Sequence, residues 1–225
     1  MNKQEKLKKI SIGVEDFKTI IEKDGYFVDK TLMIQNLIKS NAMVTLFTRP
    51  RRFGKTLNQF MIRRFFEDEI TEKGEKVDNG YLFDGLKIAE CGEEILKHQQ
   101  QYPVIFMTLK SAKQPNFEMA YGALADEIYN EFMRHRYVLQ SDALLPIEKE
   151  RYENLLNRRA DEKEVAKALA FLSECLFKYH GKNTIIKCTP CQGHIHFYFL
   201  LFFTVGFRYC QRVYPCFEVV VIFDR

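Results

Sequence analysis

Apolar and polar positions follow two different periods along the first 186 residues, and together they predict an α/β fold. Unbroken apolar runs at residues 43–48 and 104–109 are typical of strands that are buried on both faces of a parallel sheet. Elsewhere apolar residues recur at spacings of three and four, as in amphipathic helices. Such helices are expected at residues 15–23, 31–39, 55–68 and 90–99 and after Asn116 and Asp161. Strands that alternate with helices indicate a parallel sheet with crossover helices.

The last two of these helices have recognisable starts. Asn116 is suited to be an N-cap, because its side chain can accept a hydrogen bond from a free amide of the first turn. Asp161 and Glu164 have the spacing of a capping box. The apolar stripes that follow consist of Phe117, Tyr121, Leu124, Ile128 and Phe132 in the first helix and of Val165, Leu169, Leu172, Leu176 and Tyr179 in the second.

The chain changes character after Ile186. Charged residues become rare in residues 183–225, whereas cysteine and phenylalanine become frequent, and no amphipathic period is visible. We therefore expect one domain at residues 1–186 and a separate tail at 187–225 that does not continue the sheet, which would leave the sheet incomplete at the C-terminus. A shifted reading frame or a truncated gene model is the preferred explanation, and a real but divergent tail is the alternative. The charged residues of this region are Lys187, Arg208, Arg212, Glu218, Asp224 and Arg225.

Residues 43–56 have the layout of a phosphate-binding loop, in which a strand leads through a tight loop into a helix. The loop ends in Gly54-Lys55-Thr56. Gly54 would let the backbone approach a phosphate closely, Lys55 would reach the β- and γ-phosphates, and the Thr56 hydroxyl would bind Mg²⁺. The usual pattern is G-x-x-x-x-G-K-[ST], and Arg49 stands here in place of the first glycine. The alternative is a basic loop on a solvated surface, but the flanking strand and helix favour the phosphate loop.

At this point the chain resembles the AAA-ATPase-like family of bacterial proteins, over about residues 10–186. Members carry a P-loop NTPase domain that is usually followed by a PD-(D/E)XK nuclease-like domain. The matching segments are Ile12-Gly13-Val14-Glu15-Asp16-Phe17, Tyr26-Phe27-Val28-Asp29-Lys30-Thr31, Thr48-Arg49-Pro50-Arg51-Arg52-Phe53-Gly54-Lys55-Thr56-Leu57, Tyr81-Leu82-Phe83-Asp84-Gly85-Leu86 and Tyr102-Pro103-Val104-Ile105-Phe106.

The resemblance implies a P-loop NTPase-like fold and a nucleotide site that uses ATP and Mg²⁺. The string from Arg49 to Thr56 is this family's own variant of the phosphate loop, so Arg49 is expected in it. Asp29 and Lys30 belong to another family motif, and they either line the nucleotide site or form a structural salt bridge. The expected nucleotide-binding residues are Arg49, Pro50, Arg51, Arg52, Phe53, Gly54, Lys55 and Thr56, with Thr56 as the Mg²⁺ ligand.

The resemblance stops where the family has its Walker B motif, an apolar strand that ends in Asp-Glu. Thr184-Ile185-Ile186 begins such a strand, but Lys187-Cys188-Thr189-Pro190 replaces its acidic end. We therefore expect ATP binding with very slow hydrolysis, because the attacking water lacks a polarising carboxylate. Residues 218–224 imitate a Walker B strand that ends in Asp224, although a terminal β-rich segment is the commoner interpretation of such a run.

Charge suggests a rival function. The chain is 46% hydrophobic and 28% charged with a net charge of +4, which describes an ordinary globular protein. Its cations are concentrated, however, in a basic patch that suits a nucleic-acid backbone as well as a polyphosphate. A nucleic-acid-binding module and a non-functional gene fragment are therefore the two alternatives to an ATP-binding domain. The basic patch consists of Arg49, Arg51, Arg52, Lys55, Arg63 and Arg64.

The remaining signals are weak or negative. Cys188, Cys191, His194 and His196 are zinc-type ligands, but their spacing is unusually compact and chance explains them better. The first residues are charged and lack the apolar core of a signal peptide, and no apolar run is long enough to cross a bilayer. Cysteines without a secretory signal indicate reduced thiols and a cytoplasmic location without a membrane partner. The oligomeric state stays open.

Overall fold

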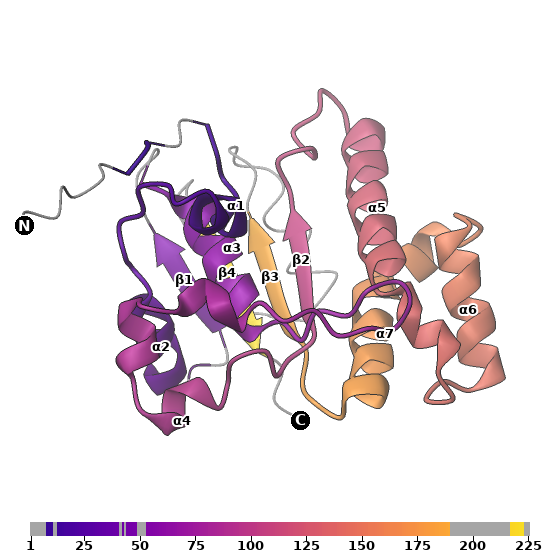
Figure 1. Ribbon diagram of the computed structural model, residues 1–225. Helices are drawn as coiled ribbons and strands as arrows, with labels where there is room; N and C mark the ends of the chain where they lie inside the picture. The colour runs from indigo at the N-terminus through magenta and orange to yellow at the C-terminus, as the bar shows by residue number, and fades with distance from the viewer. Residues whose placement is uncertain are drawn as a thin grey trace, which may run out of the picture.

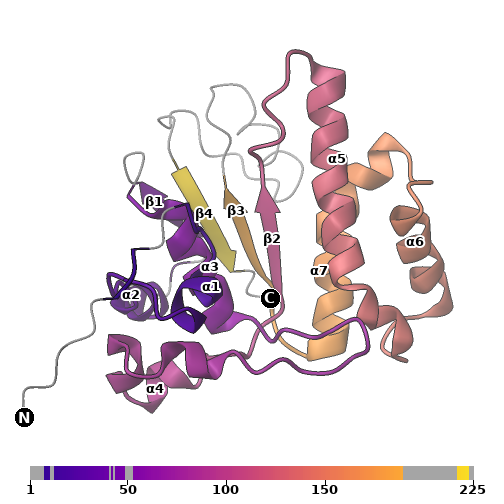
Figure 2. The same cartoon turned by 45° about the horizontal axis from the view of Figure 1, so that its top comes forward.

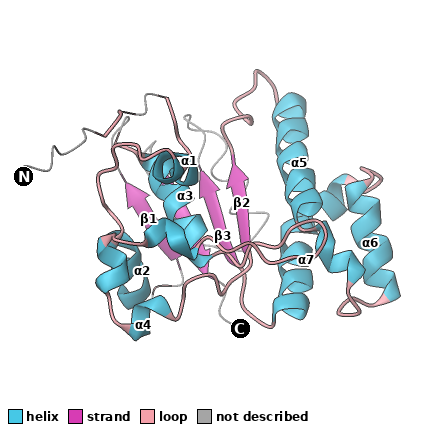
Figure 3. Cartoon of the chain, in the orientation of Figure 1, coloured by secondary structure: helices cyan, strands magenta, loops and turns pink. Residues whose placement is uncertain are grey.

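The computed structural model describes residues 8–10, 13–40, 42, 44–48, 53–189 and 217–222. These residues form a sheet with helices on both faces, as Figure 1 and Figure 3 show. The helices and strands are α1 (Phe17–Glu22), α2 (Leu32–Ser40), β1 (Val44–Thr48), α3 (Lys55–Phe66), α4 (Glu93–Leu96), β2 (Val104–Thr108), α5 (Phe117–Arg134), α6 (Pro146–Leu156), α7 (Glu162–His180), β3 (Ile185–Thr189) and β4 (Phe217–Ile222), with 3₁₀-helices η1 (Gly80–Phe83), η2 (Lys87–Glu90) and η3 (Arg136–Gln140).

The strands lie in the order β1-β4-β3-β2. β2 and β3 pair in parallel, with Val104 opposite Ile185. β4 is antiparallel to both of its neighbours, so β1, β2 and β3 all run in the same direction. Figure 2 shows the arrow of β4 pointing against the others. The carboxyl ends of β1, β2 and β3 therefore share one edge of the sheet, which is the edge that leads from β1 toward α3.

Successive residues of β2 and β3 face different helical layers, as the period of two in a strand requires. Val104 and Ile185 pack with α1, α2 and α3, whereas Ile105 and Ile186 pack with α5, α6 and α7. Each layer buries a core of its own against the sheet. Because both faces of β2 are covered, this strand has no polar face, which explains its apolar run in the sequence.

The C-terminal end of α5 covers the outer edge of β2. The amide of Phe106 donates a 2.8 Å hydrogen bond to the Glu131 carboxylate. The carbonyl of Val104 accepts from the Arg134 guanidinium, and the His135 ring nitrogen lies 3.2 Å from it. These side chains take the place of a neighbouring strand, so this part of the edge presents few unpaired backbone groups.

Both predicted helix starts are confirmed. The side chain of Asn116 accepts a 2.9 Å hydrogen bond from the amide of Met119, and Asp161 accepts a 2.8 Å bond from the amide of Glu164. The capping box at Asp161 is only half formed, because the Glu164 carboxylate pairs with Arg151 at 2.8 Å. The helix expected at residues 90–99 is short and covers only Glu93–Leu96.

α6 was not predicted from the sequence, although a signal for it was present. Pro146 occupies the first turn, and the Glu148 carboxylate accepts a 3.0 Å hydrogen bond from the amide of Leu145. Proline at the first position and glutamate at the third are typical of a helix start. The apolar positions of α6 make only a weak stripe, with Tyr152 and Leu155 buried, so periodicity did not indicate the helix.

The mixed α/β class is confirmed, and the sheet is parallel only in part. β3 extends to Thr189, which lies past the boundary expected at residue 186, and residues 217–222 pair within the same sheet as β4. The expectation that residues after 186 do not continue the sheet is therefore wrong for residues 187–189 and 217–222. The division of the chain into a domain at residues 1–186 and a tail at 187–225 stays a prediction.

Candidate functional site

The start of α3 lies just beyond the carboxyl end of β1. Gly54 is the N-cap residue of this helix, with φ 70° and ψ 28°, and it offers no side-chain cap. The left-handed backbone conformation at this position favours glycine, since a Cβ would be strained there. The first amides of a helix have no intrahelical acceptor, so this end of α3 presents free N–H donors and the positive end of the helix dipole.

Half of the expected nucleotide-binding residues can be placed. Lys55 and Thr56 are half-buried in the first turn of α3, directly after Gly54. Phe53 is 56% exposed. Arg49, Pro50, Arg51 and Arg52 lie outside the described residues.

Lys30 lies beside this helix start, although 23 positions separate it from Phe53. Its Nζ atom is 3.5 Å from the carbonyl oxygen of Phe53. A Cβ placed on Gly54 would lie 4.0 Å from the same Nζ. The structure thus brings a residue from a distant segment of the sequence to the start of α3.

Asp29, the neighbour of Lys30, has a different role. Its carboxylate accepts hydrogen bonds from the Thr31 amide (2.8 Å), the Thr31 hydroxyl (2.6 Å) and the Lys87 amide (2.8 Å). Burial favours the neutral acid, but these bonds, led by that from the Lys87 amide, hold the pKa of Asp29 below its usual value. Asp29 therefore anchors its segment to η2.

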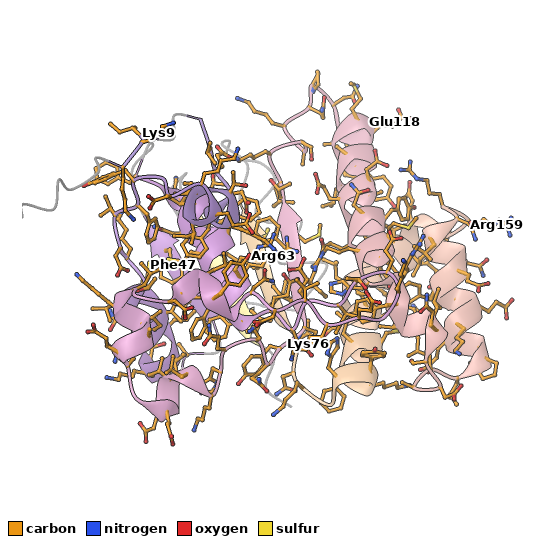
Figure 4. The ribbon with its side chains drawn as sticks, viewed as in Figure 1. Lys9, Phe47, Arg63, Lys76, Glu118 and Arg159 are labelled. Carbon is orange, nitrogen blue, oxygen red and sulfur yellow. The ribbon has the colours of Figure 1, made fainter. Side chains whose placement is uncertain are left out.

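The basic patch is smaller in the fold than in the sequence. Arg63 pairs with Glu67 at 2.6 Å, and Arg64 pairs with Glu69. Their side chains are only 12% and 15% exposed, and Figure 4 shows Arg63 in the interior of the fold. Arg63 and Glu67 are four residues apart, a spacing that favours an ion pair on a helix and that could have predicted this pairing. Neither arginine is free to bind a nucleic-acid backbone.

A buried lysine stands where the resemblance led us to expect an acidic residue. Lys187 lies in the middle of β3, is 1% exposed and donates a hydrogen bond to the Gln59 carbonyl of α3. Its ammonium is also 5.9 Å from the centre of the Phe106 ring. This contact between β3 and α3 was not visible in the sequence. It places a lysine, not a carboxylate, beneath α3.

β4 does not bring its C-terminal end to this site. Phe217 lies opposite Thr48 at the loop edge, whereas Ile222 lies opposite Ile185 at the other edge. Asp224 lies outside the described residues. A Walker B strand would run parallel to β1, whereas β4 runs antiparallel to it.

The zinc hypothesis falls mainly on residues that are not described. Cys188 is half-buried, and Cys191, His194 and His196 lie outside the described residues. Within the part of the chain that the structure describes, no three His, Cys, Asp or Glu side chains gather as a metal site. Among those same residues, no helix combines the length and the apolar character needed to cross a bilayer.

Comparison with known proteins identifies the family of the chain. The family model for AAA-ATPase-like proteins, described as predicted AAA-ATPases, matches residues 11–186 and so includes the segment from Lys30 to Thr56. Neither the curated proteins nor the solved structures gave a significant match. The family match ends at Ile186, where the sequence resemblance also stops. It covers well over half of the chain, and we conclude that the protein belongs to the AAA-ATPase-like family.

Proposed function

We propose that this chain is a P-loop NTPase-like domain that binds ATP with Mg²⁺ at the start of α3 and hydrolyses it very slowly. The observation that carries the proposal is Gly54 as a left-handed N-cap between β1 and α3. It leaves the amides of the first turn free for an anion, next to Lys55 and Thr56. Membership of a family of predicted AAA-ATPases supports a nucleotide as that anion.

The chain's own residues divide the work. The first amides of α3 and the Lys55 ammonium would hold the phosphates, and Arg49, Pro50, Arg51, Arg52 and Phe53 would complete the loop. The Thr56 hydroxyl is an oxygen donor of the kind that Mg²⁺ prefers, and it follows Lys55 directly. The metal would neutralise phosphate charge when bound.

We expect Lys55→Ala to weaken ATP binding at least tenfold, or about 1.4 kcal/mol, because it removes the ammonium carried by the first residue of α3. Thr56→Ala should weaken binding with Mg²⁺ present and have little effect in EDTA. Calorimetric titration of ATP into the full chain measures both. Lys39→Gln is a control at the last turn of α2, before β1 begins. Equal ATP affinity in the wild type and Lys55→Ala would contradict the proposal.

Hydrolysis should be slow, and Asp224→Asn should leave it unchanged. Lys187 occupies the place of the acidic pair, and β4 runs in the wrong direction to supply a substitute. Loss of one polarising group costs on the order of 10²-fold in rate, so we expect turnover below roughly 0.1 per second against about 10 per second for a typical enzyme. A phosphate-release assay decides this. Fast turnover that Asp224→Asn abolishes would contradict the proposal that the site lacks a polarising carboxylate.

The nucleic-acid alternative is weakened by the ion pairs of Arg63 and Arg64. This alternative makes a different prediction. Binding to a nucleic-acid backbone weakens steeply as the salt concentration rises, and Mg²⁺ competes with it. Titration of a short DNA duplex at two salt concentrations separates it from ATP binding.

A further inference from the structure

The start of α3 gathers positive charge that the fold does not neutralise. Lys55 lies in the first turn and Lys30 lies beside Gly54, while the helix end itself carries a positive partial charge. No carboxylate among the described residues forms an ion pair with either lysine. Arg63 and Arg64, further along the same helix, are both paired with glutamates. The fold thus neutralises the cations of the helix body and leaves the two at its start available to an anion.

Lys30 is held in place by bonds on both sides of it. Asp29, before it, is fixed to Thr31 and to the amide of Lys87. Thr31, after it, is fully buried, and its hydroxyl accepts a 3.1 Å hydrogen bond from the amide of Ile88. The backbone of Lys30 is therefore anchored to η2, and only the exposed side chain reaches toward Phe53. Such anchoring reduces the entropy that is lost when a ligand engages the ammonium.

Among the described residues, the contact of Lys30 with Phe53 uses only one of the N–H donors of the ammonium. An ammonium has several N–H groups, and a single carbonyl oxygen at 3.5 Å engages one of them weakly. The others are exposed beside the helix start. A charge-assisted hydrogen bond to a phosphate oxygen is stronger than one to a neutral carbonyl.

We propose that Lys30 is a second phosphate-binding cation of this site, one that reaches the bound polyphosphate from the anchored segment before β1. The inference rests on the proposed function, since the ligand is the same nucleotide. It divides the roles of two neighbours in one motif: Asp29 is structural, and Lys30 contacts the ligand. Its contribution should grow with the number of phosphates, because the attraction is to phosphate charge.

The test titrates the full chain with ATP, ADP and inorganic triphosphate in the presence of Mg²⁺. Lys30→Gln should weaken the binding of ATP and of triphosphate about tenfold, and that of ADP by less. Lys30→Arg should keep affinity within roughly threefold of the wild type, because it keeps the charge. Lys39→Gln, an exposed lysine at the last turn of α2, is the matched control and should bind as the wild type does.

Two measurements separate a phosphate-binding role of Lys30 from a structural role and from the proposed function itself. Thermal unfolding without ligand should be the same for the wild type and Lys30→Gln, because the side chain is exposed. A loss of stability that accounts for the weaker binding would make Lys30 structural and overturn the inference. If the wild type binds ATP, Lys55→Ala does not and Lys30→Gln does, the inference about Lys30 alone is wrong. If the wild type binds neither ATP nor triphosphate, both proposals fall.

Discussion

Replacement of Arg134 by methionine is expected to lower the free energy of unfolding by about 3–5 kcal/mol, the cost of breaking a buried ion network from one side. Arg134 donates hydrogen bonds to Glu67, to Glu131 and to the carbonyl of Val104. The Glu67 side chain is only 2% exposed. Burial favours its neutral form, but the charges of Arg134 and Arg63 hold the pKa of Glu67 below its usual value. Without Arg134, Glu67 would keep only its pair with Arg63.

Arg136→Met is the matched control, two positions further along. Arg136 pairs with Glu72 at 2.5 Å, but the two side chains are 42% and 63% exposed. Pairs on the surface contribute about 0–1 kcal/mol, so this variant should remain close to the wild type. Urea unfolding of the three proteins makes the comparison. Similar losses in Arg134→Met and Arg136→Met would show that the buried network is not what stabilises α5 against β2.

The network also bears on the candidate site. Glu67 directly follows α3 and receives hydrogen bonds from Arg63 of that helix and Arg134 of α5. It therefore fixes the far end of α3 to the layer across β2, while Gly54 begins the other end.

Acidification from pH 7 to 5 should also destabilise the fold, by up to about 1.4 kcal/mol per pH unit for each histidine that stays neutral when folded. Burial, reinforced by the nearby Arg134 charge, holds the pKa of His135 well below its usual value. Burial also lowers the pKa of His180, although Asp68, at 3.2 Å, opposes the shift. In the unfolded chain both histidines bind a proton near pH 6.5, and in the folded chain they do so only at lower pH. Stability is thus retained above about pH 6.5 and lost as the pH falls below it.

The two histidines are joined through one tyrosine. The Tyr137 hydroxyl lies 3.1 Å from a ring nitrogen of His135 and 2.8 Å from one of His180. The other ring nitrogen of His135 faces the carbonyl of Val104 at 3.2 Å and the Glu131 carboxylate at 3.8 Å. This chain of contacts connects β2, η3 and the end of α7, so protonation within it affects all three.

His135→Gln should make the free energy of unfolding depend less steeply on pH. The slope should fall by the equivalent of about one proton, since glutamine does not titrate. His98→Gln is the control. His98 is only half-buried, where it stacks on Tyr102, and a smaller change in slope is expected. Urea unfolding at pH 7.5, 6.5 and 5.5 gives the slopes. A wild-type stability that is flat over this range would contradict the assignment of neutral histidines.

Elements with strong local signals were predicted well. Asn116 and Asp161 cap helices because a short polar side chain can bond a free amide wherever the chain turns into a helix. The runs that end at Thr48 and Thr108 are strands, and in β2 the apolar character follows from burial on both faces. α6 was missed because its apolar stripe is weak, so its burial depends on α5 and α7 more than on its own pattern.

The sequence by itself determined the class of the fold, the family, and the Gly54-Lys55-Thr56 string at the start of a helix, since these depend on local spacing and backbone chemistry. Only the tertiary structure decided which charges remain available. It paired Arg134 with Glu67, buried Lys187 beneath α3, ran β4 antiparallel, and brought Lys30 to Phe53. Charge pairing and strand direction depend on contacts between segments far apart in the chain, and no local pattern specifies them.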